Sequence, residues 1–141
     1  MKIGMTFICL MLLSQTAVAK PQQKPVYTPK TGSVERKAVL DALRKPVVKE
    51  MNQKVIFHNV TMNVKSGWAY VTAIGKDTNG KPLKKFGDQY FPFQALLRKK
   101  GNTWQVLSWG SGGGTDATDT AMKRYPQAPR EIFLPYTGPA S

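Results

Sequence analysis

Residues 55–75, VIFHNVTMNVKSGWAYVTAIG, set the architecture of this chain. β-Branched and aromatic residues are concentrated in two runs, 55–64 and 68–75, and such residues favour β-strands. The short linker Lys65-Ser66-Gly67 is typical of a tight turn, so we predict an antiparallel hairpin. Period-two alternation then places one set of side chains on a common face of the first strand: Ile56, His58, Val60, Met62 and Val64.

Two more strands are expected after this hairpin. The sequence DTNG at 77–80 is a turn signal, and a polar loop then runs to about residue 89. A third strand is predicted at 90–99, where Pro92 indicates an edge position or a bulge. Gly101-Asn102 turns the chain into a fourth strand at 103–109. Alternation assigns Phe91, Phe93, Ala95 and Leu97 to one side of the third strand, with Tyr90, Gln94 and Arg98 opposite.

A helix is predicted before the hairpin and a shorter one after the last strand. Ser33 can cap the first helix, and Pro46 is expected to end or kink it. The second helix is expected from Thr115 or Asp116 through Arg124, after a flexible glycine-rich segment at 110–114. We therefore predict an α+β fold with an N-terminal helix packed in two layers on a four-stranded antiparallel meander, and a short C-terminal helix.

The N-terminus has the pattern of a secretory signal peptide. Lys2 precedes an apolar run at 3–13, and Ala17-Val18-Ala19 is a typical cleavage site before Lys20. The run is shorter than the roughly 20 residues that a membrane-spanning helix needs. We expect residues 1–19 to be removed, residues 20–31 to form a flexible linker rich in Pro and Lys, residues 32–134 to form a single domain, and residues 135–141 to form a loose tail.

Export and charge together limit the function. The single cysteine, Cys9, lies in the predicted signal, so the mature chain would have no disulfides or thiolate metal sites. The formal net charge of +13 attracts anions. We expect a periplasmic or secreted protein whose partner is an acidic protein or an anionic component of the cell envelope. The compartment argues against nucleic acid, and the sequence predicts no transmembrane segment after signal cleavage and no cofactor.

Several segments resemble those of small secreted proteobacterial proteins with a cystatin-like, or nuclear-transport-factor-2-like, α+β fold. The matching segments are GSVERKA at 32–38, LDALR at 40–44, WAYV at 68–71, ALLRK at 95–99, WQV at 104–106 and TD at 115–116. The resemblance spans about residues 32–133. It implies the fold and brings no activity with it, and the glycine run at 112–114 departs from the shorter Gly-Pro-type turn of that group.

The candidate binding residues form an aromatic and basic group and a helix-end group. The first group, Trp68, Tyr70, Tyr90 and Arg98, resembles a stacking surface for nucleic-acid bases or sugars. Core packing is nevertheless expected for most aromatic residues of the sheet. The second group is a weak anion site in which the glycine segment 110–114 is assisted by Lys123 and Arg124. It lacks the Gly-Lys-Ser/Thr ending of a nucleotide-binding loop.

Histidine and the carboxylates are too few for a conventional zinc site, and no metal is predicted. Asp88 and Asp116 are two further candidate binding residues. With the single histidine, His58, they are also the candidate bases of an enzyme. We interpret His58 mainly as a packed structural residue and Asp116 as part of a helix start.

The sequence favours an exported, basic, non-catalytic binding module, of which an inhibitor or immunity-type protein is one version. Two alternatives stay open. A small pocket enzyme of the nuclear-transport-factor-2-like type would have an apolar pocket with one of the candidate bases at its bottom. A purely electrostatic envelope-associated protein would lose its binding as salt screens its charges.

Overall fold

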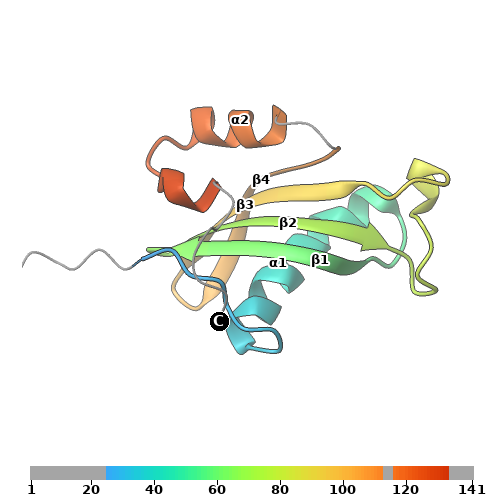
Figure 1. The fold of residues 1–141 in the computed structure, drawn as a ribbon, viewed down its shortest axis with the longest axis horizontal. Coiled ribbons are helices and arrows are strands. Elements are labelled where there is room, and N and C mark those ends of the chain that lie inside the picture. The colour runs from blue at the N-terminus through green and yellow to red at the C-terminus, as the bar shows by residue number, and fades with distance from the viewer. Residues whose placement is uncertain (1–24, 113–115, 134–141) are drawn as a thin grey trace, which may run out of the picture.

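The central element is an antiparallel sheet with the strand order β1-β2-β3-β4 (Figure 1). Its strands are β1 (Ile56–Lys65), β2 (Trp68–Lys76), β3 (Pro92–Lys100) and β4 (Thr103–Ser111). Helix α1 (Val34–Met51) precedes the sheet and helix α2 (Asp116–Arg124) follows it, with 3-10 turns η1 (Lys84–Phe86) and η2 (Arg130–Phe133). The predicted α+β fold, with an N-terminal helix, a four-stranded meander and a short C-terminal helix, is confirmed.

This computed structural model describes residues 25–112 and 116–133. The predicted signal peptide with Cys9, the first part of the predicted linker, the glycines at 113–114 with Thr115, and the predicted tail lie outside the described residues.

Capping residues set both ends of helix α1. The Ser33 side chain accepts a hydrogen bond from the Arg36 backbone N–H at 3.2 Å, and Asn52, in the left-handed region at φ 52°, ends the helix. The helix does not end at Pro46, because its buried face continues across that residue. This face repeats every four residues: Val39, Leu43, Val47 and Met51. Burial of the later residues offsets the single backbone hydrogen bond that proline removes.

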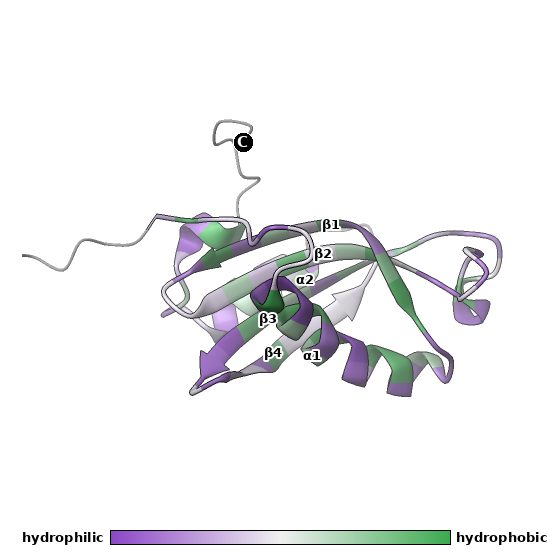
Figure 2. Cartoon of the chain, turned by 90° about the horizontal axis from the view of Figure 1, so that it is seen from below, coloured by the Kyte–Doolittle hydropathy of each residue, from purple (hydrophilic) through white to green (hydrophobic). Residues whose placement is uncertain are grey.

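One face of the sheet packs against α1. Its buried side chains alternate along the strands: Met62, Val64, Ala69, Val71, Ala73, Phe93, Ala95, Leu97 and Trp104. Hydrophobic and hydrophilic residues alternate along α1 in Figure 2, as expected for a helix with one buried side. Phe93, Ala95 and Leu97 lie on the predicted common face.

The opposite face carries a partial third layer, so the expectation of only two layers was wrong. Trp68, Tyr70 and Leu96 form a buried strip on that face, and α2 and η2 cover it with Ala121, Ala128 and Ile132. Figure 1 shows α2 and α1 on opposite sides of the sheet. An apolar strip of this size needs a cover, and the segment after β4 supplies one.

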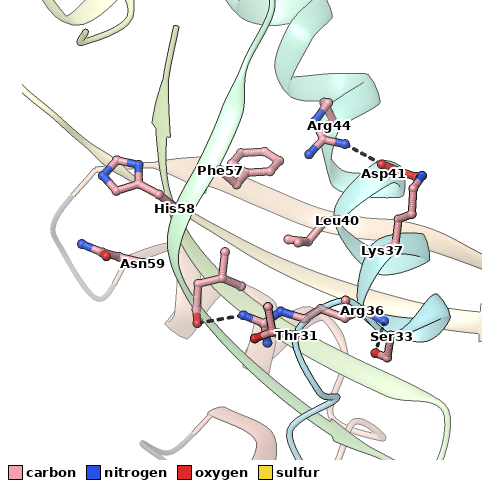
Figure 3. A pocket seen from close by; sticks show the side chains of 12 residues that line it. Thr31, Ser33, Arg36, Lys37, Leu40, Asp41, Arg44, Phe57, His58 and Asn59 are labelled. Atoms are coloured by element: carbon pink, nitrogen blue, oxygen red, sulfur yellow. Dashed lines mark hydrogen bonds and ion pairs between the residues drawn. The ribbon is translucent and has the colours of Figure 1, made fainter. Parts of the chain in front are cut away.

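A bulge in β1 reverses part of the predicted alternation. Pairing with β2 shifts between His58 and Thr61, and Asn59 has a φ of 49°. The prediction that His58 and Val60 share a face was therefore wrong. Val60 packs towards the α1 core, whereas His58 points to the other side of β1 (Figure 3). An extra residue in a bulge resets the period-two pattern.

Part of the predicted linker is paired with the sheet. In residues 25–31, which we call the strap, the Tyr27 backbone exchanges two hydrogen bonds with Val64, at 2.9 and 2.8 Å. The Tyr27 hydroxyl donates to Glu35 at 2.6 Å. The strap therefore connects the outer edge of β1 to the start of α1.

Candidate functional site

A groove of about 600 Å³ lies between the first half of α1 and the edge strand β1 (Figure 3). Both elements contribute to it, together with the end of the strap at Thr31. The side chains of Phe57 and Leu40 point into the space between strand and helix, whereas His58 and Asn59 point away from it. His58 and Asn59 therefore line the groove with their backbone, and their side chains point away from it.

The groove combines apolar and cationic groups. Leu40, Phe57 and Val60 pack against the core beneath it, and the charged side chains along its walls are Arg36, Lys37, Asp41 and Arg44. The Arg44 guanidinium carbon lies 5.4 Å from the centre of the Phe57 ring, a cation–π contact. This arrangement can hold a ligand that carries both apolar and negatively charged groups.

Two arginines of α1 hold the outer edge of the β1 segment. Arg44 Nε donates to the Val55 carbonyl at 3.2 Å, and Arg36 donates to the Val60 carbonyl at 3.5 Å and to Pro29 of the strap at 3.2 Å. Charged groups on an edge strand limit uncontrolled strand pairing. A guanidinium has five N–H donors, so these bonds leave donors for an anion.

Asp41 is the carboxylate of the groove, and it is already paired. It lies 2.6 Å from Lys37 Nζ and 2.5 Å from Arg44 Nη1. The hydrogen bond from Lys37 is the main reason that the pKa of Asp41 is lowered from its ordinary value. A carboxylate whose pKa lies below its ordinary value has little affinity for a proton near neutral pH, so Asp41 is a poor general base. Because the groove is lined by three cations, Arg36, Lys37 and Arg44, and by one carboxylate, it stays positive.

The candidate bases of the enzyme alternative do not meet in this groove. Asp88 and Asp116 are exposed on a loop and at the start of α2. The His58 ring packs edge-on against Tyr90, with ring centres 6.0 Å apart, and its buried Nδ1 has no hydrogen-bond partner among the described residues. None of these three groups lies at the bottom of the groove, which was the mark expected of that enzyme.

The predicted aromatic and basic group is not a stacking surface. Trp68 and Tyr70 are 6% and 7% exposed, because α2 and η2 cover them. The Tyr70 hydroxyl is hydrogen-bonded to Thr118, and burial raises its pKa. Arg98 is exposed, and its guanidinium carbon lies 4.8 Å from the centre of the Trp68 ring. Tyr90 is exposed elsewhere and donates to the Gly80 carbonyl at 2.7 Å.

The predicted helix-end group is likewise not assembled in the described part of the chain. Lys123 and Arg124 lie in the last turn of α2, whereas the glycine segment precedes its first turn. With a rise of about 1.5 Å per residue, the two ends of this helix lie about 12 Å apart. The two cations therefore do not flank the helix start.

Sequence reasoning did not single out Arg36 and Arg44 as candidate binding residues. One signal was available. Arg36, Leu40 and Arg44 are spaced by four, so they follow one another along one side of α1. That spacing does not reveal the neighbouring strand, because the strand is brought there by tertiary folding.

Within residues 25–112 and 116–133, no group of three or more His, Cys, Asp or Glu side chains is placed to hold a metal ion. In the same ranges, no helix is long and apolar enough to cross a membrane. No protein family, curated protein or solved structure matches the chain. The resemblance to secreted cystatin-like proteins therefore stays a prediction.

Proposed function

We propose that this chain is an exported, basic, non-catalytic binding module that holds an acidic protein partner in the groove between α1 and β1. The observation that carries the proposal is the charge of the groove, whose lining includes three cations, Arg36, Lys37 and Arg44, and one carboxylate, Asp41, which is paired with Lys37 and Arg44. The cystatin-like classification and the periplasmic or secreted location are parts of the same proposal.

The chemistry of the groove indicates what kind of segment binds there. Aspartate or glutamate side chains would pair with the arginines, whose planar guanidinium groups bind carboxylates with two parallel hydrogen bonds. Apolar side chains of the same segment would cover Leu40 and Phe57. An inhibitor or immunity-type role is the version in which the complex is tight and survives moderate salt.

Charge reversal at Lys37 tests the proposal. The Lys37 side chain is 76% exposed, so Lys37→Glu changes the charge of the groove with little effect on packing. The matched control is Lys49→Glu, which makes the same change on an exposed residue of the last turn of α1. The exported form of each protein is immobilised and exposed to envelope extract of its own organism at low and high salt, and bound proteins are identified by mass spectrometry.

We expect one acidic protein to be retained at high salt by the unchanged protein and by Lys49→Glu, and to be lost with Lys37→Glu. Retention of the same partner by Lys37→Glu would place the binding site outside the groove. Capture of no protein at either salt would reject the partner-binding proposal and favour the enzyme alternative.

A further inference from the structure

A second cationic region lies at one end of the sheet, apart from the groove. The β1–β2 and β3–β4 turns are adjacent there, since the Lys99 backbone N–H donates to the Gly67 carbonyl at 2.8 Å. Figure 1 shows both turns on the left, with the C-terminal end of α2 above them. We call this region the basic end, and its cations are Lys65, Arg98, Lys99, Lys100, Lys123, Arg124 and Arg130.

Contacts with the sheet bring the C-terminal cations to this end. The ring of Tyr125, the residue after Arg124, lies 6.5 Å from the Trp68 ring, on which Arg98 stacks. Glu131, the residue after Arg130, forms an ion pair with Lys65 at 3.4 Å. Cations from three separate parts of the sequence therefore lie at one end of the sheet.

The positive charge of the basic end is largely unpaired. Lys65 is mostly covered, and every other cation of the basic end is exposed. The Lys65–Glu131 pair is the one ion pair at this end among the described residues. The acidic residues of α2, Asp116 and Asp119, lie in its first turn, at the other end of the helix.

The basic end has charge without an apolar centre. The large exposed apolar side chains of the described residues are Tyr27, Val34, Ile56 and Tyr90, and of these only Tyr27 is next to the basic end, through its pairing with Val64. Protein–protein interfaces are built around apolar and aromatic side chains at their centre. A mainly cationic surface without an apolar centre is instead suited to dispersed headgroup charges, which attract lysine and arginine without insertion.

We propose that the basic end binds the surface of a bilayer that contains anionic phospholipid. The strap begins beside this region, because pairing of Tyr27 with Val64 brings residue 25 close to the basic end. This binding uses residues other than those of the groove, so it does not depend on the acidic partner.

Vesicle binding by paired charge reversals tests this inference. The exported protein is mixed with vesicles of phosphatidylethanolamine and phosphatidylglycerol, or of phosphatidylcholine alone, and the bound fraction is measured by sedimentation. The test variant is Lys99→Glu/Lys100→Glu. The matched control is Lys84→Glu/Lys85→Glu, which makes the same change on two exposed residues of η1, away from the basic end.

We expect the unchanged protein to bind the anionic vesicles and not phosphatidylcholine, and Lys99→Glu/Lys100→Glu to weaken binding about tenfold or more. The control should weaken it less than about threefold, because charges beyond a Debye length from the surface contribute little. A second variant at this end, Lys123→Glu/Arg124→Glu, should reproduce the loss, so a folding defect in one variant leaves the other as the test. Equal losses in test and control pairs, or binding that is absent or indifferent to lipid charge, would overturn the inference.

Discussion

The two faces of the sheet are covered in different ways. The face under α1 is covered by a single long helix that buries aliphatic side chains and Phe93. The opposite face is covered by the shorter α2 and η2, where polar bonds accompany the packing. Asn63 Nδ2 donates to the Ile132 carbonyl at 2.9 Å, and the Tyr125 hydroxyl donates to the Leu107 carbonyl at 3.2 Å.

The α1 face therefore contributes mainly to the stability of the fold, and the opposite face mainly to the position of α2 and η2. Burial of apolar surface is the main favourable contribution to folding, so the α1 face should carry most of the free energy of unfolding. A net hydrogen bond contributes less, but its geometry is specific. The hydrogen bonds on the opposite face therefore orient α2 and η2, and with them the cations Arg124 and Arg130 of the basic end.

The largest expected effect is at Phe93. Its ring is fully buried and lies over Gly75, where a Cβ atom would come within 2.6 Å of it. Phe93→Ala should lower the free energy of unfolding by about 3–5 kcal/mol, because it opens a cavity in the main core. Urea denaturation followed by circular dichroism measures this. A loss below about 1 kcal/mol, the range of ordinary substitutions, would show that the α1 face is not the dominant core.

A smaller effect is expected at Asn63, on the opposite face. Asn63→Ala removes the donor to the Ile132 carbonyl and should lower the free energy of unfolding by about 1–3 kcal/mol. It should also increase the quenching of tryptophan fluorescence by an added quencher, because release of η2 from β1 exposes Trp68. The control is Thr61→Ala, two residues earlier on the same strand face and exposed. Equal free energies of unfolding for Asn63→Ala and Thr61→Ala would show that the hydrogen bond from Asn63 does not stabilise this face of the sheet.

The smallest effect concerns the strap. Partial burial, and then the hydrogen bond to Glu35, raises the pKa of Tyr27 from 10.0 to about 12. The folded state thus favours the neutral phenol, so the contribution of this group to stability is present below pH 10 and is lost as pH rises towards 12. Urea midpoints of the unchanged protein and Tyr27→Phe should converge over that interval. A constant difference would show that the raised pKa does not contribute to folding.

Much of the fold could be predicted from local patterns, but the candidate site could not. The hairpin turn at Lys65-Ser66-Gly67 and the Ser33 cap are encoded within a few residues, and both are where they were expected. The orientation of His58 was missed, because a bulge depends on pairing with a neighbouring strand. The same holds for Arg36 and Arg44, whose carbonyl partners are 24 and 11 residues away.

The sequence by itself determined the α+β order of elements, the positive charge and the pattern of an export signal. These properties follow from composition, from period-two and helical spacing, and from turn and capping residues that act over a few positions. Only the tertiary structure decided that α2 covers Trp68 and Tyr70, that two arginines of α1 reach the edge of β1, and that three distant basic segments share one end of the sheet. Those outcomes depend on which surfaces are buried together, and burial is decided by contacts between residues far apart in the chain.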